Sequence, residues 1–242
     1  MKLLSDNIQK TIICLFLCGK SAFTFGEEID PTDVSYVSLN PYTSEVTVSW
    51  YKSESANIQY ARLLYIYDET TLIKGKGIVD VAGNEDNSFL FKTDTIAMFP
   101  YNADERPISI AVDAYSENGT NSTSLREYHT TMVSTAKTTH CPSQILIAWT
   151  QYYGYGIAVE KYEIVETSNG VETVVKECLP TEKTTLINLN ENTERYFFVR
   201  ATFHDCRGNL QSSNSSMCSV QESMPIGPKF IKAENISIHG TD

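Results

Sequence analysis

Apolar and polar residues alternate along short segments of this chain, and this period of two constrains the fold more than any other feature. Val46, Val48 and Trp50 fall on one face of a predicted strand, and residues 145–149 repeat the pattern, again ending in Trp, about 100 residues later. Turn-forming clusters separate the strands at residues 83–87, 117–121, 168–170 and 207–209. Short strands with such regular turns predict an all-β sandwich fold.

The length of the chain predicts how many sandwiches it forms. A single β-sandwich takes about 100 residues, so 242 residues suit two of them in tandem. Hydrophobic residues make up 41% and charged residues 20%, which is ordinary globular usage and argues against a disordered chain.

The amino terminus has the pattern of an export signal. Lys2 and Lys10 precede or flank an apolar run at residues 11–19, and small residues follow it up to Gly26. The run is too short for a membrane-spanning helix, which needs about 20 apolar residues. We therefore expect residues 1–26 to be a signal peptide cleaved after Gly26, and an exported mature protein with no transmembrane span.

Lipid attachment at Cys18 is the alternative, but it requires a small residue just before the cysteine and Leu17 is large. Cleavage after residue 26 removes three lysines and one aspartate, and lowers the net charge from −11 to −13. So acidic a protein should repel nucleic acid and anionic lipid.

The second half of the chain resembles the fibronectin type III family. Strands are expected at residues 144–149 and 159–166, and the family signature Leu-x-Pro-x-Thr-x-Tyr-x-Phe-x-Val-x-Ala follows them. Five signature positions agree, namely Leu189, Thr193, Phe197, Val199 and Ala201. Glu191 replaces the proline and Arg195 the tyrosine, so we expect the tyrosine-corner hydrogen bond of such sandwiches to be absent.

The amino-terminal pattern, the resemblance of the two sandwiches and the Pro-containing last stretch together predict four segments. They are a signal peptide at 1–26, a first sandwich at 27–133, a second sandwich at 134–222, and a connector at 223–242 that looks like the first strand of a further domain. Residues 89–107 exceed the family norm and predict an insertion in the first sandwich. Because no Gly-, Pro- or Ser-rich linker lies near residue 133, we expect a stiff junction.

A closer resemblance covers about 90 residues of the second sandwich, roughly one domain's length. The segments at 152–154, 159–164, 213–218 and 225–231 are similar to modules of gliding-motility-associated, type IX-secreted bacterial surface proteins. The resemblance implies export through the periplasm to the cell surface or the extracellular space, within a longer polypeptide.

Four cysteines remain after cleavage, and all lie in the second half of the chain. In an exported protein they favour disulfides over metal binding. With strands alternating in direction, Cys141 and Cys218 fall at one pole of the sandwich, whereas Cys178 and Cys206 fall at the other. We therefore predict the bonds Cys141–Cys218 and Cys178–Cys206.

The sequence contains no pattern typical of catalysis or cofactor binding. A nucleophile elbow, a phosphate-binding loop, a dinucleotide fingerprint and paired metal-binding histidines are all missing. His204-Asp205-Cys206 suggests zinc, but an exported protein would more readily oxidise the thiol. We expect no enzyme activity, no cofactor and no metal.

Two features suggest sites of another kind. Tyr152, Tyr153 and Tyr155 alternate with glycines in the loop between the second and third strands of the second sandwich, where aromatic rings could form a binding loop. The alternative is that these rings cover the core beside Trp149. Asp94-Thr95-Ile96 resembles an O-glycosylation motif of the same bacterial group, with Thr95 as the acceptor.

Together these features predict a non-catalytic scaffold or adhesion module of an exported bacterial cell-surface protein, with a protein or glycan ligand that the sequence does not identify. Two alternatives stay open, a pure spacer and an accessory module of an exported carbohydrate-active enzyme. Fold alone does not choose among them.

Overall fold

The computed structural model describes residues 29–30, 32–68, 73–96, 99, 102–122, 127–139, 144–189 and 194–220. The expected signal peptide, the expected connector after residue 222 and Cys141 lie outside the described residues.

The first sandwich has two antiparallel sheets. One sheet has the order β1-β2-β5, with strands Val34–Leu39, Val46–Trp50 and Asn87–Phe91. The other has the order β4-β3-β6-β7, with strands Ile73–Ala82, Ile58–Asp68, Ser109–Ser116 and Tyr128–Thr130. A short 3-10 helix, η1 (Thr93–Thr95), follows β5.

The second sandwich repeats the arrangement. One sheet has the order β8-β9-β13, with strands Ser134–Thr138, Gln144–Trp149 and Thr184–Asn188. In the other, β12 (Val171–Cys178), β11 (Val159–Ser168) and β14 (Arg195–His204) lie side by side, and β14 also pairs with β15 (Leu210–Asn214) and β16 (Cys218–Val220). A two-residue strand, β10 (Tyr153–Gly154), belongs to the loop after β9.

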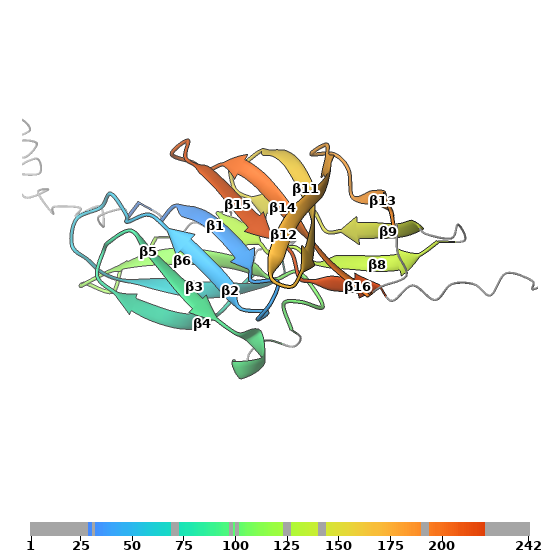
Figure 1. Cartoon of the computed structure of the whole chain (residues 1–242). Coiled ribbons are helices and arrows are strands. Elements are labelled where there is room, and N and C mark those ends of the chain that lie inside the picture. The colour runs from blue at the N-terminus through green and yellow to red at the C-terminus, as the bar shows by residue number, and fades with distance from the viewer. Residues whose placement is uncertain are drawn as a thin grey trace, which may run out of the picture.

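Each sandwich therefore places its first, second and fifth strands in one sheet and the remaining main strands in the other, with consecutive strands antiparallel. This is the fibronectin type III-like order that the sequence predicted. The chain is all-β apart from η1 in the part that the structure describes, and the two sandwiches are visible as separate groups of strands in Figure 1.

The cores form where the alternating pattern placed them. Trp50 is buried in the core of the first sandwich and Trp149 in that of the second, where it packs on Tyr162 with ring centroids 5.5 Å apart. The signature residues Phe197 and Val199 are fully buried in the second core. Since burying one such side chain contributes about 1.5–3 kcal/mol, these strands stabilise the sandwich through the alternation itself.

Turn chemistry sets the longest hairpin of the second sandwich. Asn169 and Gly170 connect β11 to β12 and both have positive φ, at 51° and 76°. Positive φ at both central residues is the signature of a type I′ turn, whose twist matches that of the strands. The Asn-Gly pair thus fixes the register, with Ser168 opposite Val171.

The two sandwiches differ between their fifth strand and the next. In the first, residues 92–108 connect β5 to β6 and include η1, whereas residues 189–194 suffice between β13 and β14 in the second. The long connection agrees with the insertion that the sequence predicted.

The two sandwiches lie side by side rather than end to end. Strand β1 runs along β15, as Figure 1 shows. Ser213 Oγ donates to the carbonyl of Val37 at 2.7 Å, and the amide of Asn214 donates to Ser38 Oγ at 2.9 Å. Because the residue numbers rise together along both strands, β1 and β15 run in the same direction.

The cysteines depart from the expected pairing. Cys178 and Cys206 are free in the structure. Cys178 pairs with Tyr162, which pairs with Ala201, so Cys178 lies two strands, or about 10 Å, from Ala201. Cys206 lies beyond the end of β14, roughly 16 Å of extended chain past Ala201. A disulfide needs Cα atoms within about 7 Å, so this bond does not form.

The prediction failed because β12 ends at Cys178, opposite Tyr162, before it reaches the pole where the turn after β14 holds Cys206. The Cys178 thiol is buried beside Thr185. Cys218 is also free and buried, next to Ser134. Its expected partner, Cys141, lies outside the described residues, so the bond between Cys141 and Cys218 stays a prediction.

We expect Cys178 and Cys206 to be alkylated when the purified protein is unfolded without reductant, because each is a free thiol. Mass spectrometry of the digested protein should find the label on both residues. Recovery of one peptide joined to the other through Cys178 and Cys206 would contradict the register of the second sandwich.

Candidate functional site: the junction between the sandwiches

Tyr152, in the loop after β9, joins the two sandwiches. The backbone amide of Val37, on β1, donates to the Tyr152 hydroxyl at 3.2 Å, which leaves the phenol hydrogen free to donate to Nδ1 of His129, 2.8 Å away. The ring stacks on Phe203 with centroids 4.5 Å apart. One buried side chain thus contacts both sandwiches through its ring and its hydroxyl.

The backbone after Tyr152 extends the sheet of the first sandwich. Strand β10 pairs with β7, with Tyr153 opposite Thr130 and Gly154 opposite His129. A Cβ atom on Gly154 would lie 2.8 Å from Cε1 of His129, closer than ordinary contacts allow. Glycine is therefore required at this position by the close approach of the imidazole.

His129 is buried at this contact, with only 2% of its surface exposed. Burial disfavours the imidazolium form and lowers the pKa of His129 to about 3. The imidazole is therefore neutral at physiological pH, which agrees with its role as acceptor of the Tyr152 hydrogen bond.

A second contact centres on Asp205, at the turn between β14 and β15. Its Oδ2 atom accepts hydrogen bonds from Tyr51 Oη at 2.6 Å, Ser35 Oγ at 2.9 Å and Gln211 Nε2 at 3.1 Å. Tyr51 and Ser35 belong to the first sandwich, whereas Gln211 belongs to the second. The carboxylate is thus held by groups from both.

The other oxygen of Asp205 organises its own turn. The backbone amides of Arg207 and Asn209 donate to Oδ1 at 3.0 and 2.9 Å. Burial by itself would raise the pKa of Asp205, but the hydrogen bonds outweigh it and lower the pKa to about 2. Hydrogen bonds to a charged group contribute about 1.5–3 kcal/mol each, so a neutral replacement would weaken the junction.

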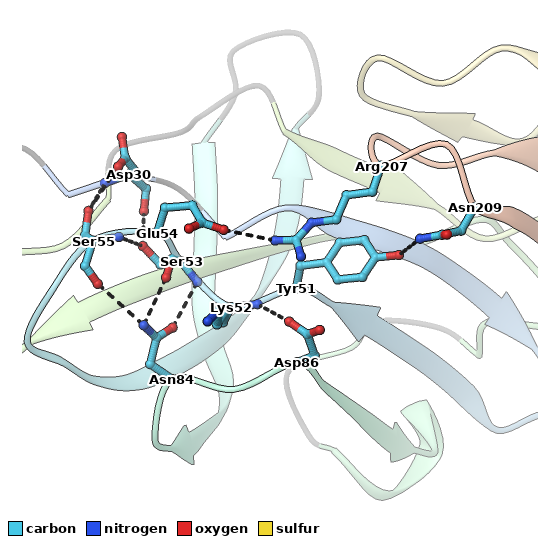
Figure 2. A network of polar contacts seen from close by, with 10 residues as sticks. All are labelled: Asp30, Tyr51, Lys52, Ser53, Glu54, Ser55, Asn84, Asp86, Arg207 and Asn209. Atoms are coloured by element: carbon cyan, nitrogen blue, oxygen red, sulfur yellow. Dashed lines mark hydrogen bonds and ion pairs between the residues drawn. The ribbon is translucent and has the colours of Figure 1, made fainter.

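The loop after β2 presents Tyr51 to this turn, and polar contacts within the first sandwich hold the loop (Figure 2). Ser53 Oγ donates to the carbonyl of Asp30 at 2.8 Å, and the Ser53 amide donates to Asn84 Oδ1 at 2.9 Å. The Lys52 amide donates to Asp86 Oδ1 at 2.9 Å. Tyr51 therefore projects from a braced loop.

Arg207 and Asn209 complete the contact from the second sandwich, as Figure 2 shows. The Arg207 guanidinium lies 4.0 Å from the centroid of the Tyr51 ring, and Asn209 Nδ2 donates to Tyr51 Oη at 2.8 Å. The Arg207 pair with Glu54, at 3.4 Å, is exposed and contributes little. The cation–π contact contributes about 0.5–2 kcal/mol.

The predicted binding loop is divided by this geometry. Tyr152 is 6% exposed and lies in the junction, while Tyr153 and Tyr155 stay on the surface at 44% and 48%. The ring of Tyr153 packs at a tilt against that of Tyr128 on β7, with ring centroids 4.7 Å apart. For Tyr152 the alternative is confirmed, because its ring belongs to the same core as Trp149. A binding role for Tyr153 and Tyr155 stays a prediction, and the sequence did not predict that the Tyr152 hydroxyl joins the two sandwiches.

The predicted acceptor Thr95 ends η1 and is exposed, and its hydroxyl donates to the carbonyl of Lys92 at 2.8 Å. Its glycosylation stays a prediction.

The structure also gives the chemistry of the remaining candidates. Cys206 is exposed, but partial burial of its thiol and the nearby carboxylates of Asp33 and Asp205 raise its pKa to about 11, so the thiol is protonated at neutral pH and a poor nucleophile. His204 faces Glu160, with 2.6 Å between Nδ1 and Oε1.

Within the described ranges, no group of three or more His, Cys, Asp or Glu side chains is arranged to hold a metal ion. The described helical residues include no segment long and apolar enough to cross a membrane.

Gly154→Ala should destabilise the protein by about 1–3 kcal/mol, because the new methyl group would meet the buried His129 ring. Gly77→Ala is a matched control, since its nearest neighbour is the half-exposed and flexible side chain of Arg62. Urea unfolding measures both free energies. An equal change in the two variants would contradict the close docking of β10.

The stability of the protein should fall in mild acid because His129 has a depressed pKa. The unfolded chain takes up a proton near the ordinary value of 6.5, whereas the folded chain does not do so until about 3. The stabilisation that the neutral His129 provides is therefore complete when the pH is above the pKa of the unfolded chain. It decreases as the pH falls below that pKa, and the loss is on the order of 2 kcal/mol at about pH 5.

Unfolding free energies at about pH 7 and about pH 5 measure this loss. His129→Gln should remove most of the difference between the two conditions, and His204→Gln should retain it. The same pH dependence in the wild type and His129→Gln would show that another group is responsible.

No family model and no curated protein matches the chain. Among solved structures it is similar to a central fibronectin III array of RIM-binding protein, at 17% identity, covering 81% of this chain and 71% of that one with a TM-score of 0.28. It is also similar to the FN1–FN3 domains of chicken CNTN1, at 16% identity, 80% and 64% coverage and a TM-score of 0.29. A third similar structure is a two-domain fibronectin type III segment of chicken tenascin. Its identity is 14%, the match covers 80% of this chain and 98% of that one, and the TM-score is 0.26. The fibronectin type III-like assignment rests on the strand order of the two sandwiches.

Proposed function

We propose that the chain is a non-catalytic adhesion module of an exported bacterial cell-surface protein, in which the two sandwiches act as one rigid binding platform. The observation that carries the proposal is the double junction at Tyr152 and Asp205, where each buried group takes partners from both sandwiches.

The side-by-side arrangement favours a platform over a spacer. Sandwiches joined end to end extend the reach of a surface protein, whereas β1 packed along β15 shortens it. Such packing also places loops of one sandwich against strands of the other and creates composite surfaces. This is the arrangement expected of a module that binds.

Export and surface location are supported by the sequence at the amino terminus and by the resemblance to type IX-secreted, gliding-motility-associated proteins. The acidic charge of −11 agrees with a protein that remains soluble outside the cell. Further domains of the same polypeptide would anchor the platform.

A domain replacement in the source bacterium tests the proposal. Cells lacking residues 29–220 should lose adhesion, and restoring the segment should recover it. Replacing the segment with an unrelated pair of fibronectin type III sandwiches should keep the protein on the cell surface, as immunolabelling of intact cells would measure, without recovering adhesion. Full recovery by the unrelated pair would establish the spacer alternative, and a cytoplasmic location would overturn the proposal.

A further inference from the structure

Two neighbouring cavities lie along the junction, one on each side of Tyr42. The larger, of about 710 Å³, is bounded by Tyr42 from the first sandwich and by the β11–β12 hairpin and the start of β14 from the second. The smaller, of about 380 Å³, is bounded by Tyr42, β1 and β15. Together they form a groove, here called the Tyr42 groove, with volumes typical of ligand sites.

The Tyr42 groove has exposed aromatic rings in its wall. Tyr42 is 52% exposed although its hydroxyl lies 3.1 Å from both Thr167 Oγ1 and a carboxylate oxygen of Glu172. Tyr196 is 39% exposed on the outer face of β14. The hydroxyl contacts hold the ring of Tyr42, and strand β14 positions that of Tyr196. The faces of both rings can therefore contact a ligand at little entropic cost.

The rest of the wall is rich in hydrogen-bonding groups. The larger cavity is lined by Asn169 and Thr173, and the smaller one by Gln211 and Asn214. Amides and hydroxyls can both donate and accept, so they match a ligand that carries many hydroxyl groups. Such a wall suits an apolar peptide poorly.

The two arginines beside the groove are already paired with carboxylates. Arg195 Nε lies 3.1 Å from Glu166, and Arg200 Nη2 lies 2.6 Å from Glu172. Neither arginine of these two pairs is left to neutralise an anionic ligand, and the net charge of −11 opposes one. The glutamates keep lone pairs that can accept hydrogen bonds from hydroxyl groups.

We infer that the Tyr42 groove binds a neutral oligosaccharide. The rings of Tyr42 and Tyr196 pack against the C–H faces of sugar residues, and the amides, hydroxyls and paired carboxylates bind the sugar hydroxyls. The inference rests on the proposed function, because it names the ligand class of the platform. It also gives the junction a role, since the groove needs both sandwiches in place.

Titration calorimetry of the intact chain with cellohexaose, xylohexaose and mannohexaose tests the inference, with an oligogalacturonate as the anionic probe. At least one neutral saccharide should bind, and the anionic probe should not. Tyr196→Ala should weaken binding at least about tenfold, because the lost ring contact belongs to the ligand alone. Tyr42→Phe should retain more affinity than Tyr42→Ala, since it keeps the ring.

Leu90→Ala is the matched control, because it removes a large side chain of similar exposure on β5, outside the groove and the junction, and should leave the affinity unchanged. Failure of all three saccharides to bind would overturn the inference, as would binding that Tyr196→Ala leaves intact. Selection from a random peptide library of a ligand that Tyr196→Ala abolishes would assign the groove to a peptide instead.

The two proposals fail differently. If saccharides do not bind but the unrelated sandwiches still fail to restore adhesion, the platform stands and only its ligand class is wrong. If the unrelated sandwiches restore adhesion fully, the platform itself is wrong.

Discussion

A carboxylate that is removed from water must be satisfied by the protein, and at the junction both sandwiches supply the donors that satisfy Asp205. Its Oδ2 atom takes hydrogen bonds from Tyr51 and Ser35 of the first sandwich and from Gln211 of the second. Without the first sandwich the carboxylate would lose the hydroxyl groups of Tyr51 and Ser35 and keep the donors of its own sandwich. Hydrogen bonds to a charged group contribute about 1.5–3 kcal/mol each, so the two hydroxyls strengthen the junction. The junction is therefore specific as well as stable, because a small shift of either sandwich breaks these bonds.

Tyr152 makes the second contact of the junction. Its ring completes the core of the second sandwich against Phe203, while its hydroxyl bonds to Val37 and His129. Folding of the second sandwich thus presents the group that holds the first. The Tyr42 groove depends on the same arrangement, because Tyr42 reaches Thr167 and Glu172 only when β1 lies along β15.

The strands and cores could be predicted from the sequence because alternation, turns and the family signature are local patterns. Residues around Trp149 and from Phe197 to Ala201 form the predicted core, and Asn169-Gly170 forms the predicted turn. The junction could not be predicted in this way. Asp205 and Tyr51 are far apart in the chain, and no periodicity pairs them. The predicted bond between Cys178 and Cys206 was wrong for a related reason: the sequence placed both residues at one pole but could not give the distance between them across the sheet, which the register of β12 with β11 sets.

The junction holds the two sandwiches side by side as one unit. Residual dipolar couplings of backbone amides in a weakly aligned sample test it most directly, because they report the orientation of each sandwich separately. Couplings from residues 32–122 and 144–220 should fit one alignment tensor in the orientation shown in Figure 1. Two tensors of different magnitude, or one that requires the sandwiches to lie end to end, would contradict it.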